Sequence, residues 1–306
     1  MRGGLRVALL TGLVGAGLAP VTAQVQQQQQ PYTLEVQVDL VSITAVVYDK
    51  SGHFVADLGP QDVEVYEDGV RQEVSIFEQA KGGEDKIPLS VMLVLDASGS
   101  MNENLHFLQE AALTFVYKLE GADQAQVVQF NDSIKGSADF TGDIDRLERF
   151  IEALQAWGGT SLYDAIQYGL DRIRDQPGRK ALVVFSDGED TTSTLSQREV
   201  IDYARAVEAS VYTVGISGRG GRSPRGFLKK VAQETGGAYF FPGDVGDLVA
   251  VFAKISEELH NHYLLAYTPK RPPDGSFRKI EVKIPSRPDL QIRVRKGYFA
   301  VRHHRR

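Results

Sequence analysis

The sequence predicts an α/β protein in which a doubly wound, mostly parallel sheet is inserted between β segments that form a small β-sandwich. Between Pro88 and His260, short and nearly continuous apolar runs alternate with helical periodicity, which is typical of a parallel sheet covered by helices on both faces. On either side, residues 32–84 and 261–300 have the alternating or β-branched pattern of antiparallel strands. Each flank alone has too few strands for a stable sheet, so we expect the two flanks to pair with each other.

The N-terminal end has the features of an export signal followed by a linker. Residues 1–23 begin with Arg2 and Arg6, continue in a short apolar stretch, and end in small residues that suit a signal peptidase. A retained membrane anchor is the alternative, although the apolar run is shorter than the roughly 20 residues that span a bilayer. Residues 24–31 are rich in glutamine and predict a flexible linker, and residues 301–306 predict a basic, solvated tail. We therefore expect an exported protein, periplasmic, secreted or in the cell envelope, whose mature chain has no membrane span.

The N-terminal β segment is expected to begin near Tyr32, directly after the linker. Ile43–Tyr48 is rich in β-branched residues, and Val63–Tyr66 and Gln72–Phe77 flank the turn signal Asp68-Gly69, which predicts a hairpin. The C-terminal segment contains three runs of the same kind. Its expected strands are Tyr263–Thr268, Arg278–Ile284 and Leu290–Arg295.

Residues 85–260 are expected to fold as one α/β domain. Leu89–Leu95 is the clearest buried strand, because apolar residues fill nearly all of it, and Leu105, Leu108 and Ala112 follow at helical spacing. The same alternation continues to the end of this part. Further strands are expected at Ala125–Phe130, Ala181–Phe185, Val211–Ile216 and Tyr239–Phe241, and further helices at Ile144–Leu154, Leu162–Ile173, Glu199–Ala209, Phe227–Thr235 and Val245–Leu259.

The composition excludes several classes of function. A formal net charge of -6 argues against a protein that binds nucleic acid through clustered Lys and Arg. The chain has no cysteine, which excludes a disulfide framework, a thiolate metal site and a cysteine nucleophile. An exported protein of this composition must therefore be stabilised by its apolar core.

Five oxygen-bearing side chains leave the predicted elements at points that can converge. Asp96, Ser98 and Ser100 follow the first buried strand, Thr160 lies on a Gly-rich loop before a helix, and Asp187 follows another strand end. Open α/β sheets bind their ligands at this edge. The set contains no His or Cys, which disfavours zinc and favours a hard cation, namely Mg²⁺, with Mn²⁺ or Ca²⁺ as alternatives. The two carboxylates balance the 2+ charge, and a coordination position left to water can accept a carboxylate from another molecule.

These residues resemble the metal ion-dependent adhesion site of the von Willebrand factor type A (VWA or VWFA) family, which has the form D-x-S-x-S, a distant Thr and a distant Asp. Asp96, Ser98 and Ser100 match the first motif, Thr160 the second and Asp187 the third, with no departure from the pattern. The resemblance covers the predicted α/β domain. It implies a Rossmann-like vWA fold, an ion held directly by the serine hydroxyls and often through water by the aspartates, and an adhesion-type function without catalytic residues.

The flanks resemble those of bacterial VWFA-related proteins of the Acidobacteria type, so a second resemblance spans nearly the whole mature chain. It is informative about architecture and says little about the partner. The residues that carry it are Phe54–Leu58, Glu67–Gly69, Tyr263–Pro269 and Arg295–Phe299.

Three classes of function compete for this sequence. The leading hypothesis is a protein-binding module whose cation coordinates an exposed Asp or Glu of a protein partner. A structural or scaffold role in a cell-envelope assembly is the alternative. A metal-dependent hydrolase is disfavoured, because no His lies in the three site loops and both aspartates are needed by the ion. We therefore expect a protein that is not an enzyme and has no nucleic-acid partner.

Other notable residues have simpler structural explanations. Trp157 stands beside the Gly-rich loop and is expected to pack in the core, with an apolar contact to a ligand as the alternative. Asp164 is expected to orient the Thr160 loop instead of touching the ion. His260 and His262 are two candidate ligands without a third, so we expect ordinary surface histidines.

Overall fold

The computed structural model describes residues 40–80, 87–187, 189–216 and 225–301, and all of these belong to one compact unit. The expected signal segment, the linker, the start of the β segment near Tyr32 and the basic tail beyond Val301 lie outside the described residues and stay predictions. In the described ranges, no helix is long and apolar enough to cross a bilayer.

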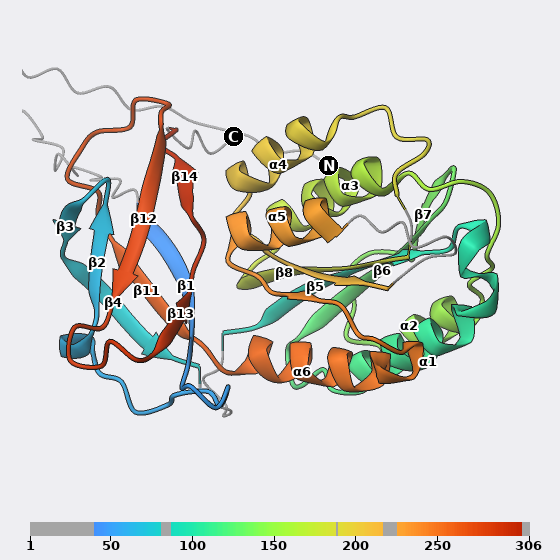
Figure 1. Cartoon of the computed structure of the whole chain (residues 1–306), viewed down its shortest axis with the longest axis horizontal. Coiled ribbons are helices and arrows are strands. Elements are labelled where there is room, and N and C mark those ends of the chain that lie inside the picture. Colours follow the sequence, from blue (N-terminus) through green and yellow to red (C-terminus); the bar gives the residue numbers. More distant parts are fainter. Residues whose placement is uncertain (1–39, 81–86, 188, 217–224, 302–306) are drawn as a thin grey trace, which may run out of the picture. The chain divides into compact units, whose positions relative to one another are not determined.

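A six-stranded sheet forms the centre of the α/β part (Figure 1). Its strand order is β10-β9-β8-β5-β6-β7, and all neighbours are parallel except β7, which is antiparallel to β6. The mostly parallel sheet is therefore confirmed, with a short edge strand, β7, that periodicity does not reveal. The strands are β5 (Leu89–Asp96), β6 (Gln124–Phe130), β7 (Ile134–Gly136), β8 (Arg179–Ser186), β9 (Ser210–Gly215) and β10 (Tyr239–Phe240).

Helices cover both faces of this sheet, as a doubly wound fold requires (Figure 1). Because successive side chains of a strand point to opposite faces, β5 contributes to two separate cores: Leu93 packs in one and Val94 in the other. All eight residues of β5 are buried, which explains its almost continuous apolar sequence. The first core is covered by α1 (Leu105–Val116), α2 (Ile144–Glu152) and α6 (Leu248–His260), and the second by α3 (Leu162–Arg174), α4 (Gln197–Ala206) and α5 (Arg225–Thr235).

The two flanks form a β-sandwich of two four-stranded antiparallel sheets. One sheet has the order β13-β1-β11-β4 and the other β14-β12-β2-β3. N-terminal β1 pairs with C-terminal β11, and β2 pairs with β12, so the expected pairing of the flanks around an inserted α/β part is confirmed. The strands are β1 (Val41–Tyr48), β2 (Glu64–Glu67), β3 (Val70–Gln72), β4 (Val74–Gln79), β11 (Tyr263–Tyr267), β12 (Phe277–Lys283), β13 (Gln291–Arg293) and β14 (Gly297–Phe299).

The hairpin at Asp68-Gly69 is shorter than the sequence predicts. Its second strand is β3, whereas the expected strand Gln72–Phe77 corresponds mostly to β4, which pairs with β11 in the other sheet. The expected pairing of that strand in the hairpin is therefore wrong. The turn itself is as predicted, because Asp68 and Gly69 have φ of 46° and 80°, the left-handed conformation of a type I′ turn. β-Branched residues continue on both sides of Glu73, and the pattern alone therefore hides the change of sheet.

A buried ion pair lies within one sheet of the sandwich and is hydrogen-bonded to the other sheet. Glu67 and Arg278 are 2% and 0% exposed, and Oε1 of Glu67 lies 3.1 Å from Nη1 of Arg278. Oε2 of Glu67 accepts hydrogen bonds from the hydroxyls of Tyr298 at 2.8 Å and of Tyr267, in the opposite sheet, at 2.9 Å. Burial and the hydrogen bond to Glu67 raise the pKa of Tyr298 to about 12. Both oxygens of the Glu67 carboxylate have partners, whereas Nε of Arg278 is buried without a hydrogen bond to a described residue. Loss of Glu67 would leave the buried charge of Arg278 uncompensated.

Arg179, the first residue of β8, holds the two chain connections of the α/β part. Its guanidinium donates to the carbonyl oxygen of Ile87, just before β5, at 3.0 Å, and to that of Leu259, in the last turn of α6. The chain therefore enters and leaves the α/β part at the same end of the central sheet, the end at which the parallel strands begin.

Candidate metal centre

The expected site residues gather at the opposite end of the sheet, where the parallel strands finish. The chain passes from β5 to β6 on one side and later returns to β8 on the other side of β5. Such a reversal of strand order opens a crevice at the carboxyl ends, which is where open α/β sheets bind ligands. Asp96 is the last residue of β5, and Asp187 directly follows β8.

Asp96 is a fully buried carboxylate held by two hydrogen bonds. It is 0% exposed, its Oδ1 accepts from the backbone N–H of Ser98 at 2.9 Å, and its Oδ2 accepts from the hydroxyl of Ser186 at 2.6 Å. Burial raises the pKa of Asp96 to about 6, although the hydrogen bonds from Ser186 and Ser98 oppose this rise. A desolvated carboxylate of this kind is costly to ionise unless a positive charge stands beside it.

Two serine hydroxyls join Asp96 to the second carboxylate. Oγ of Ser98 lies 3.0 Å from Oγ of Ser100, and the Ser100 hydroxyl donates to Oδ1 of Asp187 at 2.7 Å. Asp187 is 1% exposed, and burial raises its pKa above the ordinary value. Ser100 is exposed, whereas the other three residues are buried, so the cluster opens to solvent at Ser100.

The Thr160 loop is placed beside this cluster by backbone hydrogen bonds. Gly99 N–H donates to the Gly158 oxygen at 3.0 Å, and Trp157 N–H donates to the Ala97 oxygen at 3.0 Å. On its other side, Thr160 N–H donates to the hydroxyl of Thr191 at 2.8 Å, and Thr191 N–H returns a bond of 2.8 Å to the Thr160 oxygen. The structure therefore brings all three expected loops together. Asp96, Ser98, Ser100 and Asp187 form one hydrogen-bonded cluster, and the backbone of Thr160 is bonded to Thr191, in the loop that follows Asp187.

The donor set fits a hard divalent cation. Two carboxylates and three hydroxyls are available, all of them oxygen donors of the kind that Mg²⁺ and Ca²⁺ prefer. Across the described residues, no three His, Cys, Asp or Glu side chains form a potential metal cluster, so a cation in this site depends on the hydroxyls as well as on Asp96 and Asp187.

The sequence of the α/β part matches one known domain family. Residues 90–254 match the model of the von Willebrand factor type A domain, a match that covers more than half of the chain. The chain belongs to the von Willebrand factor type A family. A VWA protein from Catenulispora acidiphila has the same fold, with a TM-score of 0.51 and 13% identity over 88% of this chain and 65% of that one.

Two further relatives extend the comparison. An uncharacterised protein of Synechocystis sp. is 23% identical over 219 residues, which are 64% of this chain and 49% of that protein, so the chain spans about half the length of this relative. Proximal thread matrix protein 1 from the mussel byssus, in a structure described as having a zinc-occupied MIDAS motif, gives a TM-score of 0.50 at 16% identity over 59% of this chain and 47% of that one. At these identities the structural similarity establishes the VWA fold.

Two supporting residues of this VWA domain were not expected from the sequence. Ser186 donates a hydrogen bond to Asp96, and its position directly before Asp187 is the feature of the sequence that could have indicated this role. Asp132 accepts a hydrogen bond from Gly159 N–H at 2.6 Å and so fixes the Gly-rich loop. Asp164 accepts from the backbone N–H groups of residues 194 and 195 at 2.9 and 3.0 Å, so it holds that loop and not the Thr160 loop.

Trp157 does not pack in the VWA core. Its side chain is 51% exposed, whereas Leu154, three residues earlier, is 4% exposed and occupies the core position. The backbone N–H of Trp157 is bonded to the Ala97 oxygen, and the indole lies outside the core. The expectation of core packing is wrong, and the alternative of an apolar contact at the site remains.

The two histidines are structural. His262 is 2% exposed and lies 3.3 Å from Nη1 of Arg179, so the expectation of a surface residue is wrong for it. Nε2 of His260 lies 3.1 Å from Oδ2 of Asp123. These contacts place the pair at the junction with the sandwich and not in a metal site.

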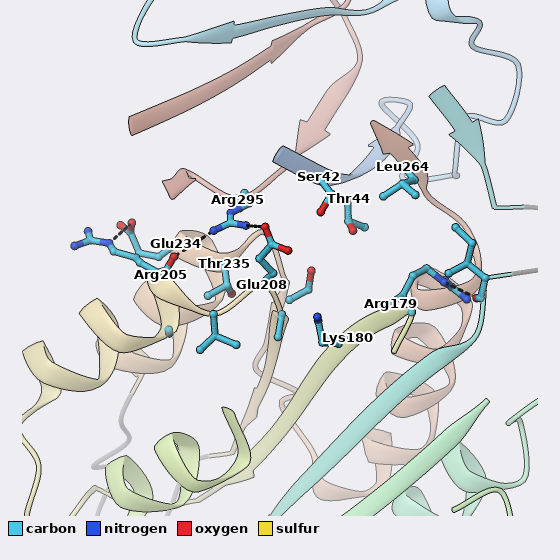
Figure 2. Close-up of a pocket in the computed structure, with 16 residues that line it drawn as sticks. Ser42, Thr44, Arg179, Lys180, Arg205, Glu208, Glu234, Thr235, Leu264 and Arg295 are labelled. Carbon is cyan, nitrogen blue, oxygen red and sulfur yellow. Dashed lines mark hydrogen bonds and ion pairs between the residues drawn. The ribbon is translucent and has the colours of Figure 1, made fainter. Parts of the chain in front are cut away.

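A cavity of about 200 Å³ is lined by residues from the start of β8 and β9 and from the sandwich (Figure 2), at the end of the sheet opposite the candidate metal site. Two of its four cationic residues pair with carboxylates: Nε of Arg205 lies 2.9 Å from Oε2 of Glu234, and Nη1 of Arg295 lies 3.6 Å from Oε1 of Glu208. The other two, Arg179 and Lys180, donate to backbone carbonyl oxygens. Because the cavity lies where the parallel strands begin, it does not extend the candidate metal site, which lies where they finish.

Proposed function

We propose that this VWA protein binds one divalent cation through Asp96, Ser98, Ser100, Thr160 and Asp187 and uses it to coordinate an exposed Asp or Glu of a protein partner. One observation carries the proposal: two buried carboxylates from different strands are joined by two hydroxyls at the switch point of the sheet. Without a cation, this arrangement buries two acidic groups whose pKa values are both raised. A bound 2+ charge would balance both of them.

Mg²⁺ is the proposed ion. The donors are oxygen atoms only, and hydroxyls add coordination without adding negative charge, so the ion keeps affinity for one more anionic ligand. The zinc-occupied MIDAS motif named for the mussel protein supports a divalent cation in this fold. For the present chain, the absence of His and Cys from the five site positions favours Mg²⁺ over zinc, with Mn²⁺ and Ca²⁺ as the alternatives to test.

The proposed role is binding without catalysis. A hydrolase would need a general base beside the ion, and in the proposed site Asp96 and Asp187 are used to hold the cation. Their burial also leaves them out of reach of a substrate, whereas Ser100 marks an opening through which a partner's carboxylate can approach. An adhesion-type contact of an exported protein, periplasmic, secreted or in the cell envelope, fits these features and the signal-like residues 1–23.

Calorimetric titration tests the cation site. Chelator-treated protein is titrated with MgCl₂, MnCl₂ and CaCl₂, and Asp96→Ala and the exposed control Asp289→Ala are treated identically. We expect wild type and Asp289→Ala to bind one Mg²⁺ per chain and Asp96→Ala to lose binding. Equal binding by Asp96→Ala and wild type would contradict the site.

Affinity capture tests the partner. Wild-type and Asp96→Ala proteins are immobilised side by side and exposed to an envelope extract with Mg²⁺. We expect a protein that wild type alone retains, that EDTA elutes, and that loses binding when one of its own Asp or Glu residues is replaced. A partner that stays bound in EDTA would count against coordination through the cation.

A further inference from the structure

We propose that Trp157 is a second contact of the same binding surface: the partner's carboxylate binds the cation while a bulky apolar side chain next to that carboxylate packs on the indole. This inference rests on the proposed function and specifies its ligand. The epitope it defines is a single Asp or Glu followed by a residue such as Leu, Ile or Phe, and not a run of acidic residues.

Exposure alone does not single out Trp157, because isolated exposed aromatics are common on protein surfaces. The other large exposed aromatics have partners within the chain. Tyr117, 55% exposed, donates its hydroxyl to Glu148 at 2.6 Å, and Tyr239, 40% exposed, lies under Lys229 at 5.1 Å from the ring centroid. For the indole of Trp157, 51% exposed, the described part of the chain shows no comparable contact.

The position of Trp157 is fixed relative to the proposed ligands. Its N–H is bonded to the oxygen of Ala97, the residue before Ser98, and the next residue, Gly158, accepts from Gly99, the residue after Ser98. The backbone on both sides of Ser98 is thus bonded to the backbone that carries the indole. A Cβ on Gly99 would lie 3.3 Å from the Gly158 oxygen, a tight contact that would require the two loops to move apart by a few tenths of an ångström.

A backbone held in this way favours the indole as a binding group. A partner does not have to order the loop, which lowers the entropic cost of association. Tryptophan is also among the residues whose truncation most often weakens an interface strongly, because it buries a large area with few rotatable bonds. In the proposed complex, the cation bound by Ser98 and Ser100 holds the partner's carboxylate. The partner side chain next to that carboxylate then lies beside this loop.

The charge around the site restricts the partner further. Asp132, Glu189 and Asp190 lie on the loops that carry or follow the proposed ligands, and Asp132 is hydrogen-bonded to the Gly-rich loop itself. Their negative charge disfavours a partner with several acidic residues near the coordinated one. One carboxylate with an apolar neighbour satisfies both the cation and the indole without this repulsion.

The experiment uses the fact that Trp157 is the chain's single tryptophan. Protein labelled with 5-fluorotryptophan gives one ¹⁹F resonance, which is followed during titration with two cyclic peptides that differ only in the residue after their one Asp, Leu or Ser. We expect a saturable shift with the Asp-Leu peptide in Mg²⁺, none in EDTA, and affinity for the Asp-Ser peptide at least about tenfold lower.

Variants separate the indole contact from the cation site. By calorimetry, Trp157→Ala is expected to bind the Asp-Leu peptide about tenfold more weakly while its Mg²⁺ affinity, its melting temperature and its binding of the Asp-Ser peptide stay unchanged. Trp157→Phe is expected to recover most of the loss, and Tyr117→Ala is the control without effect. Mg²⁺-dependent binding of both peptides with equal affinity overturns the role of Trp157 and leaves the cation function standing. Binding of neither peptide by protein that holds Mg²⁺ overturns both proposals.

Discussion

The substitution Asp96→Asn should stabilise the metal-free protein and at the same time abolish its response to Mg²⁺. Asparagine has the shape of aspartate, can still accept the hydrogen bond from Ser98 N–H, and can donate to the Ser186 hydroxyl, which also accepts. What it removes is the buried negative charge. If Asp96 had a purely structural role, Asp96→Asn would lower the stability of the metal-free protein, because the loss of charge-assisted hydrogen bonds would destabilise the fold.

The magnitude follows from the pKa of Asp96. Burial raises it from the ordinary value of 3.8 to about 6, and each unit corresponds to about 1.4 kcal/mol, so the ionised group costs the metal-free fold up to roughly 3 kcal/mol. The folded chain binds the proton more tightly than the unfolded chain. The cost is therefore absent below about pH 4, grows as the pH rises to about 6, and is complete above that value.

Thermal unfolding followed by circular dichroism measures these effects at pH 5 and pH 8, with EDTA or with Mg²⁺. In EDTA at pH 8, Asp96→Asn is expected to melt at least a few degrees above wild type, since about 1 kcal/mol corresponds to roughly 2–4 °C for a domain of this size. Mg²⁺ at 100 times its dissociation constant should stabilise wild type by about 2.7 kcal/mol and leave Asp96→Asn unchanged. Asp289→Asn is the control. A lower melting temperature of Asp96→Asn in EDTA, with the Mg²⁺ shift retained, would refute the reasoning.

Three further outcomes are expected. Ser186→Ala removes the 2.6 Å hydrogen bond to Asp96 and should weaken Mg²⁺ binding, measured by calorimetry, roughly tenfold, because loss of a group that orients a metal ligand commonly has this effect. Unchanged Mg²⁺ affinity would show that Ser186 does not orient Asp96. Glu67→Ala leaves Arg278 buried without its carboxylate and should lower the free energy of unfolding in urea by about 3–5 kcal/mol, against less than about 1 kcal/mol for Asp57→Ala, which breaks an exposed pair. Residues 85–260 expressed alone should give a folded, Mg²⁺-binding α/β domain, and loss of cooperative unfolding in that protein would count against an autonomous inserted domain.

Much of the fold follows from the sequence because burial on both faces leaves a strong signal. β5 is apolar along nearly its whole length, since helices cover it on two sides, and the helices after it keep their periodicity. β7 has only three residues, Ile134–Gly136, at an exposed edge, and gives no such pattern. The change of sheet after Gln72 is equally hidden, because a strand has the same alternation in either sheet.

For the candidate site, too, some features could be predicted from the sequence and others could not. The identity of the five oxygen donors and their places at strand ends could be predicted, because chemistry and topology restrict them. Side-chain exposure could not, since it depends on backbone hydrogen bonds between distant loops. The backbone of Trp157 is bonded to Ala97, 60 positions earlier in the chain, and the buried ring of His262 lies against Arg179, 83 positions earlier. Neither contact is visible in a local pattern.

The path of β5 has a mechanical consequence for the proposed binding of a partner. β5 starts at the junction with the sandwich, where Arg179 holds Ile87, and finishes at Asp96 in the metal centre. A pull between a bound partner and the sandwich therefore runs lengthwise through this strand. Hydrogen bonds to β6 and β8 flank it on both sides and run across the direction of pulling, so many of them must break at once before the strand can slide. Tension would thus be carried by a strand that is hydrogen-bonded along both of its edges.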